Sequence, residues 1–121
     1  MNNIHVGQNR FRYRVEESWA IFPCGGQDGE AVGVACDSRN RVYVFLRGPS
    51  PVRVYEPDGR QVTAWGDGVF VRPHGIFIGP DDTVYCTDDF GHTVRAFTPE
   101  GRPLLTLGTG QPSDTGATSI D

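Results

Sequence analysis

Residues 33–66 read GVACDSRNRVYVFLRGPSPVRVYEPDGRQVTAWG, and residues 75–108 read GIFIGPDDTVYCTDDFGHTVRAFTPEGRPLLTLG. The two stretches align at an offset of 42 residues without a gap, and nine of the 34 aligned positions are identical. An internal period of about 40–45 residues is typical of the four-stranded blades of β-propellers. The sequence therefore predicts an all-β protein that is built from repeated blades.

Each copy contains four strand candidates that are separated by turn-forming residues. In the first copy the candidates cover residues 33–36, 41–45, 52–56 and 61–65. The tripeptide Pro57-Asp58-Gly59 lies between the third and fourth candidates and recurs in the second copy as a Pro-acid-Gly tripeptide. Proline presets φ and glycine accepts positive φ, so this tripeptide favours a tight turn. Each copy is therefore expected to form a four-stranded antiparallel sheet.

The repeat predicts about two and a half blades. The predicted units are a half blade at 10–24, complete blades at 31–66 and 73–108, and a linker to a missing blade at 109–121. In the half blade, residues 19–22 align with the fourth strand and begin with Trp19. Propeller blades bury their faces against neighbouring blades in a closed ring. We therefore expect either part of a longer protein or a chain that oligomerises to complete the ring.

Composition and charge argue against several classes of protein. The net charge is −4 and the arginines are scattered, which disfavours nucleic acid as a partner. There is no apolar run of about 18 residues and no apolar signal-peptide core, so we expect no membrane contact and a cytoplasmic location, with secretion of a longer parent protein as the alternative. Cys24, Cys36 and Cys86 form no Cys-x-x-Cys motif. They are expected to be buried small hydrophobes in a reducing compartment, with one disulfide as the alternative.

His74 precedes the leading glycine of the second copy, and its equivalent in the first copy is Val32. The first strand of each propeller blade lines the central channel, so these two positions belong to one ring near the channel mouth. Three imidazoles at such a level would suit Zn²⁺ with an open fourth position. The alternative is a packed histidine that is hydrogen-bonded to a neighbouring carbonyl, and one histidine does not decide between the two.

Two resemblances extend this reading. TDDFGHTVRAFTPEG, residues 87–101, resembles the hallmark of NHL-repeat β-propellers, which implies that Asp88 and His92 tie neighbouring strands together. AVGVACDSRNRVYVFLRG, RPHGIFIGPDDTVYCTDD and LLTLGTGQPSDTG, in this order, resemble the peptidyl-α-hydroxyglycine α-amidating lyases over about residues 31–115. These lyases are NHL propellers, so the resemblance implies a six-bladed ring and a peptide substrate.

The lyase resemblance also implies a metal-assisted site. His74 matches a zinc ligand, Arg47 matches an arginine that engages the substrate, and Val32 and Ile76 match residues whose backbone carbonyls bind calcium. Zinc would act as a Lewis acid on the substrate hydroxyl, and the products would be a peptide amide and glyoxylate. Arg47 has a structural alternative, since it could pair with Asp88 or Asp89 of the next blade.

The zinc ligands other than His74 would lie in blades that this chain does not contain, so the chain alone is predicted to be inactive. A second hypothesis is a non-catalytic NHL propeller that serves as a scaffold for protein interaction or ligand binding. That scaffold would need neither a metal nor Arg47.

Overall fold

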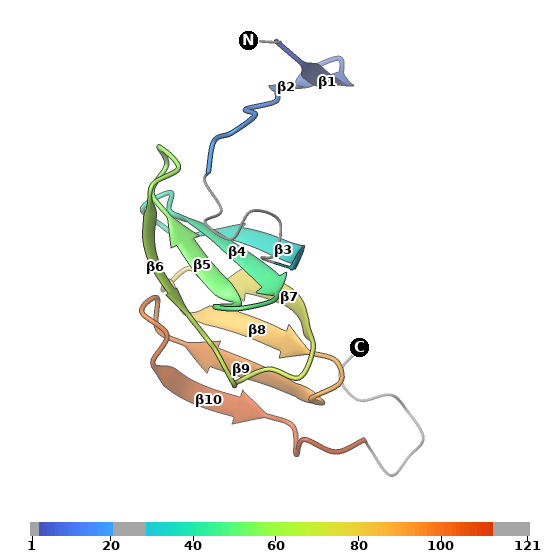
Figure 1. Ribbon diagram of the computed structural model, residues 1–121, viewed down its shortest axis with the longest axis vertical. Helices are drawn as coiled ribbons and strands as arrows, with labels where there is room; N and C mark the ends of the chain where they lie inside the picture. Colours follow the sequence, from blue (N-terminus) through green and yellow to red (C-terminus); the bar gives the residue numbers. More distant parts are fainter. Residues whose placement is uncertain (1–2, 21–28, 113–121) are drawn as a thin grey trace.

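The computed structural model describes residues 3–20 and 29–112 (Figure 1). These residues form ten strands and no helix, in one two-stranded and two four-stranded sheets. Every strand pair is antiparallel, so the all-β expectation is confirmed. Within the described ranges, no helix is long and apolar enough to cross a membrane.

The two four-stranded sheets follow the sequence repeat. Blade 1 contains β3 (Glu30–Cys36), β4 (Val42–Arg47), β5 (Val52–Tyr55) and β6 (Gln61–Trp65). Blade 2 contains β7 (Pro73–Ile78), β8 (Val84–Asp88), β9 (Thr93–Phe97) and β10 (Pro103–Leu107). The strands of each blade pair in chain order. Figure 1 shows the two blades stacked, with the first strands β3 and β7 in contact.

Both blades have a β-bulge at the same position of their first strand. The pairing of β3 with β4 skips Val32, and the pairing of β7 with β8 skips His74. A bulge bends its strand and changes the direction of the extra residue's side chain. Val32 and His74, which are equivalent in the 42-residue repeat, therefore both lie on a bulge of the first strand.

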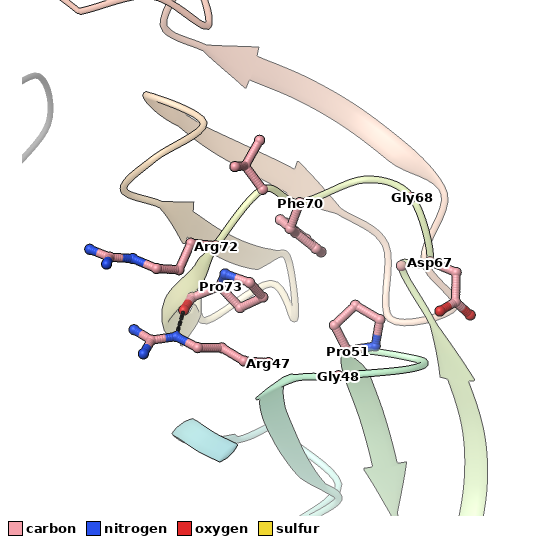
Figure 2. Close-up of a pocket in the computed structure, with 10 residues that line it drawn as sticks. Arg47, Gly48, Pro51, Asp67, Gly68, Phe70, Arg72 and Pro73 are labelled. Atoms are coloured by element: carbon pink, nitrogen blue, oxygen red, sulfur yellow. Dashed lines mark hydrogen bonds between the residues drawn. The ribbon is translucent and has the colours of Figure 1, made fainter. Parts of the chain in front are cut away.

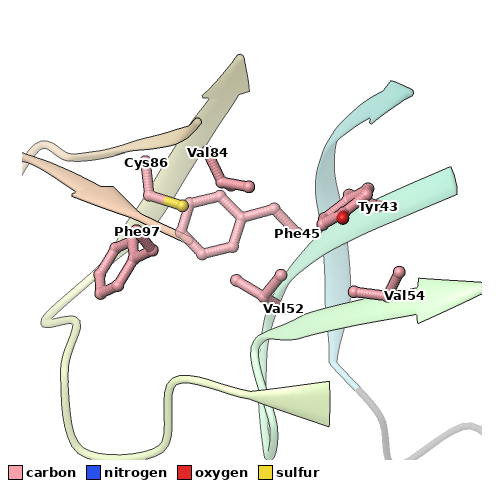
Figure 3. Close-up of a cluster of buried hydrophobic side chains, with 7 residues drawn as sticks. All are labelled: Tyr43, Phe45, Val52, Val54, Val84, Cys86 and Phe97. Carbon is pink, nitrogen blue, oxygen red and sulfur yellow. The ribbon is translucent and has the colours of Figure 1, made fainter. Parts of the chain in front are cut away.

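The hydrophobic core lies between the two blades. Its buried members come from β4, β5, β8 and β9 and are Tyr43, Phe45, Val52, Val54, Val84, Cys86 and Phe97. Figure 3 shows the ring of Phe45 reaching from blade 1 toward Cys86 and Phe97 of blade 2. Phe70, in the connection between the blades, stacks edge-on to both Phe45 and Phe97 at centroid distances of 4.9 and 5.9 Å. Aromatic packing therefore holds the blades together.

The cysteines do not share one environment. Cys86 is buried, and this burial raises the pKa of its thiol to about 12. Cys36 is exposed, so the expectation of a buried Cys36 is wrong. Cys36 lies two residues beyond the exposed Val34 and therefore on the same outward face of β3. Both thiols are free, and Cys24 lies outside the described residues.

The N-terminal segment forms a separate hairpin of β1 (His5–Gln8) and β2 (Phe11–Arg14). Of the half blade expected at residues 10–24, β2 supplies a strand, while Trp19 lies in a bend and residues 21–24 fall outside the described part. The expected linker at 109–121 is likewise described only as far as residue 112.

A buried carboxylate organises the turn between β3 and β4. The side chain of Asp37 is inaccessible to solvent. It accepts hydrogen bonds from the backbone N–H groups of Arg39 and Arg41, from Arg41 Nε and from the Tyr43 hydroxyl, at 2.9–3.0 Å. Burial raises the pKa of Asp37, but the hydrogen bonds and the charge of Arg41 outweigh it and hold the pKa below 3.8.

We expect this turn to make stability depend on pH at the acidic end. A folded-state pKa below 3.8 means that the contribution of Asp37 is complete above the unfolded pKa and is lost as the pH falls through the folded pKa. Urea unfolding of the wild type and of Asp37→Asn between about pH 6 and about pH 2 should show a difference that shrinks toward low pH. Asp58→Asn, at an exposed turn, serves as the control. Parallel pH profiles of the wild type and Asp37→Asn would contradict this assignment.

Candidate functional site

The structure brings Arg47 and the strand of His74 together, although they belong to different blades. Arg47 is the last residue of β4, and His74 lies exposed on the bulge of β7. Arg47 Nε donates a hydrogen bond to the Pro73 carbonyl at 3.0 Å, which Figure 2 shows as a dashed line. The guanidinium group therefore lies beside the residue that directly precedes His74.

Arg47 has one further partner in the described part of the chain. Its Nη1 lies 3.4 Å from Glu30 Oε2, and the side chain of Glu30 is 78% exposed. An ion pair with so exposed a partner contributes little to stability. The alternative in which Arg47 pairs with Asp88 or Asp89 is wrong, because those two carboxylates bind the segment just before His74 instead.

Asp88 fixes that segment through the backbone. It is 3% exposed and accepts hydrogen bonds from the N–H groups of Val71 at 2.7 Å, Arg72 at 2.9 Å and Gly91 at 2.7 Å. One carboxylate at the end of β8 therefore holds both the approach to β7 and the turn toward β9. These contacts are of the strand-tying kind that the NHL resemblance implies for Asp88.

Arg72 is a residue of this region that the sequence analysis missed. Arg72 Nε donates to Asp89 Oδ1 at 2.8 Å, and its Nη2 bonds the second carboxylate oxygen. The guanidinium carbon also lies 3.4 Å from the ring centroid of Phe90. The hydrogen bond from Arg72 lowers the pKa of Asp89 to about 2, and the positive charge of Arg72 acts in the same direction. The sequence signal that could have identified Arg72 is its position directly before Pro73-His74.

A cavity of 220 Å³ opens between the loops of the two blades. Figure 2 shows Arg47 and Arg72 extending on the same side of the segment that leads into β7, with Asp67 on the opposite side of the cavity. Phe70 and Pro51 supply apolar lining. The cavity therefore combines apolar walls with two guanidinium groups at one edge, which is an arrangement suited to a small ligand with an anionic group.

The remaining predicted site residues lie on the first strands and in a turn. Val32 and Ile76 are half-buried on the adjacent strands β3 and β7 and pack against the core. These strands approach closely at Gly33, where a Cβ would lie 3.3 Å from Ile76 N. His92 lies in the turn between β8 and β9 with a φ of 51°, and its equivalent in blade 1, Ser50, has a φ of 47°.

The described residues do not by themselves form either implied metal site. Structural and catalytic zinc sites use three or four protein ligands. No three His, Cys, Asp or Glu side chains within residues 3–20 and 29–112 lie close enough together to hold a metal ion. Calcium takes six to eight oxygen ligands, and the carbonyls of Val32 and Ile76 would supply two. His74 and these carbonyls are at most part of a larger ligand set.

Stacked four-stranded antiparallel sheets that repeat every 42 residues, with a bulge in each first strand, define these units as blades of a β-propeller. The fold is similar to that of selenomethionine-substituted virginiamycin B lyase from Staphylococcus aureus, with a TM-score of 0.56. That similarity covers 76% of this chain and 30% of the other, and at 15% identity it shows a shared fold alone.

Two curated proteins are similar in sequence. Peptidyl-alpha-hydroxyglycine alpha-amidating lyase 1 of Drosophila melanogaster is 39% identical over 79 residues, which are 60% of this chain and 15% of the lyase. NHL repeat-containing protein 3 of Homo sapiens is 35% identical over 107 residues, which are 80% of this chain and 30% of that protein. The chain thus spans less than a third of the length of either relative. No protein-family model matches it.

Proposed function

We propose that these blades belong to a closed NHL-like propeller that acts as a peptidyl-α-hydroxyglycine amidating lyase. The similarity to the fly enzyme supports this proposal, as it reaches 39% identity over 79 residues. The observation that carries it is the hydrogen bond from Arg47 to the Pro73 carbonyl, which holds a guanidinium group beside the bulge of His74. An arginine and a histidine from two blades would then face the same channel mouth.

The proposed reaction breaks the bond between the peptide nitrogen and the hydroxylated α-carbon. The hydroxyl group loses its proton and becomes the aldehyde of glyoxylate, while the nitrogen gains a proton and becomes the peptide amide. Atoms balance without water as a reactant. Arg47 would bind the carboxylate of the hydroxyglycine, because a guanidinium group is always charged and matches the geometry of a carboxylate.

The zinc and calcium ions that the resemblance implies would need ligands from further blades. This chain would contribute the His74 imidazole and the carbonyls of Val32 and Ile76, which is fewer donors than either ion requires. No step of the reaction is therefore assigned to a metal. The proposed role of Arg47 depends on its own charge and on its contact with Pro73.

The test uses a polypeptide that carries these blades within a complete ring and measures glyoxylate released from a hydroxyglycine peptide. Arg47→Lys should raise KM by about 10–100-fold, because hydrogen bonds to charged groups are worth about 1.5–3 kcal/mol and lysine lacks the forked donors. His74→Ala should lower the rate of turnover by a factor at least as large as the rise in KM of Arg47→Lys. His5→Ala, in the exposed hairpin, is the matched control and should change neither.

A non-catalytic scaffold is the second candidate function. It is supported by the human NHL repeat-containing protein 3, whose similarity covers the larger share of this chain. The same variants separate the two candidates. If His74→Ala leaves both metal content and turnover unchanged in a complete ring, the lyase proposal fails and the scaffold is favoured.

A further inference from the structure

Trp65, the last residue of β6, joins blade 1 to blade 2. Its indole N–H donates to the Pro99 carbonyl at 3.1 Å, and its ring centroid lies 4.9 Å from that of Phe97. Gly101 lies against the same ring, since a Cβ there would be 2.5 Å from Trp65 Cγ. The end of the fourth strand of one blade thus docks on the Pro-acid-Gly turn of the next blade.

The indole of Trp19 makes the equivalent hydrogen bond and ring contact with blade 1. Its indole N–H donates to the Pro57 carbonyl at 2.8 Å, and its ring centroid lies 5.7 Å from that of Tyr55. The backbone carbonyl of Trp19 lies against Gly59, where a Cβ would be 1.7 Å from the oxygen. The three blade 1 residues are the 42-residue equivalents of those that Trp65 contacts. Trp19 therefore occupies on blade 1 the place that Trp65 occupies on blade 2.

The equivalent residue at the end of blade 2 is Leu107. Leu105 and Leu107 are 50% and 51% exposed, whereas their equivalents in blade 1, Thr63 and Trp65, are half-buried against the neighbouring blade. Figure 1 shows β10 at one end of the stacked blades and the N-terminal segment at the other end, beside blade 1. We call the surface of Leu105 and Leu107 the trailing face, and the surface of blade 1 under Trp19 the leading face.

We propose that the trailing face docks the leading face of blade 1 in a second copy of this chain, and that Trp19 blocks this contact while it covers the leading face. The proposal continues an interface that the molecule already contains, because blade 1 and blade 2 meet through the 42-residue equivalents of these two faces. Head-to-tail contacts of this kind build rings or open-ended assemblies. A segment that covers an otherwise open blade face acts as the cap that repeat proteins need. This inference rests on the blade repeat, and it agrees with the closed ring of the proposed function where copies of this chain, rather than further blades of one polypeptide, complete that ring.

The experiment follows the mass of the full chain against concentration by light scattering or sedimentation. Trp19→Ala should associate with a dissociation constant at least tenfold lower than the wild type, because it frees the leading face. Leu107→Asp in the Trp19→Ala background should return the mass to that of the wild type. Leu107→Trp in that background should strengthen association, because it restores the indole that can donate to the Pro57 carbonyl.

Thr106→Asp is the matched control for Leu107→Asp. Thr106 is exposed on the same strand but on the opposite face, so its substitution should leave the association of Trp19→Ala unchanged. Far-UV circular dichroism monitors folding, and Trp19→Phe is a milder variant that keeps the ring but loses the N–H donor. Folded Trp19→Ala and Trp19→Phe that stay as monomeric as the wild type would overturn the proposal. So would association that persists with Leu107→Asp.

Discussion

Replacing Asp88 by alanine is expected to lower the free energy of unfolding by about 2–4 kcal/mol. The carboxylate is buried and accepts three backbone hydrogen bonds, from Val71, Arg72 and Gly91. Alanine would leave three N–H donors without that acceptor, and each unsatisfied buried donor costs about 1–3 kcal/mol. The donors are only partly buried, so water would recover part of the loss. Urea unfolding measures the effect.

Two further variants distinguish this role from a general loss of charge. Asp88→Asn keeps one acceptor oxygen and should fall between the wild type and Asp88→Ala. Asp89→Ala removes the neighbouring carboxylate, whose ion pair with Arg72 is partly exposed and should contribute about 1 kcal/mol or less. Amide hydrogen exchange at Val71 and Arg72 should accelerate in Asp88→Ala. If Asp88→Ala lowers the free energy of unfolding by no more than Asp89→Ala does, the proposed role of Asp88 is refuted.

Gly101→Ala should be destabilising by about 3 kcal/mol, which combines backbone strain with steric overlap. Gly101 has a φ of 92°, a conformation that costs an L-residue with a side chain about 1–2 kcal/mol. The added Cβ would also lie 2.5 Å from Cγ of Trp65, so the indole would have to move away from Phe97. Urea unfolding gives the cost, and tryptophan fluorescence reports the displacement.

Gly68→Ala isolates the backbone contribution. Gly68 has a φ of 75°, but a Cβ there would have no heavy atom within 4 Å. We expect Gly68→Ala to cost about 1–2 kcal/mol, from strain alone. Equal stability of Gly101→Ala and Gly68→Ala would contradict this prediction. It would mean that steric overlap with Trp65 adds nothing to the cost of a side chain at Gly101.

The blades themselves could be predicted from the sequence because their signals are local. The fourth strand of blade 1 matches the expected residues 61–65, and β5 ends one residue before the expected limit. The Pro-acid-Gly turns carry their own geometry, and Gly59 and Gly101 both have φ near 90°. β3 begins at Glu30, before the expected residue 33, because the bulge at Val32 lets pairing with β4 continue past the irregularity.

The site was only partly predictable, because its contacts join residues that are distant in sequence. The repeat placed Arg47 opposite Asp89 of the next blade, yet Arg72 binds Asp89, and Arg47 turns to the Pro73 carbonyl. Ungapped alignment at 42 residues also placed Trp19 over the first residue of the fourth strand. Its contacts with Pro57 and Tyr55 instead match those made by the last residue of that strand.

The sequence by itself determined the repeating unit, the strand order within each blade and the turns between strands, since strand patterning and turn chemistry act over a few residues. Only the tertiary structure decided which arginine pairs with which carboxylate, which face Trp19 covers and that His74 lies on a bulge. These outcomes depend on how the two sheets pack, and packing selects among partners that are distant from one another in the sequence. The stacking of blade 1 on blade 2 is therefore what assembles the candidate site.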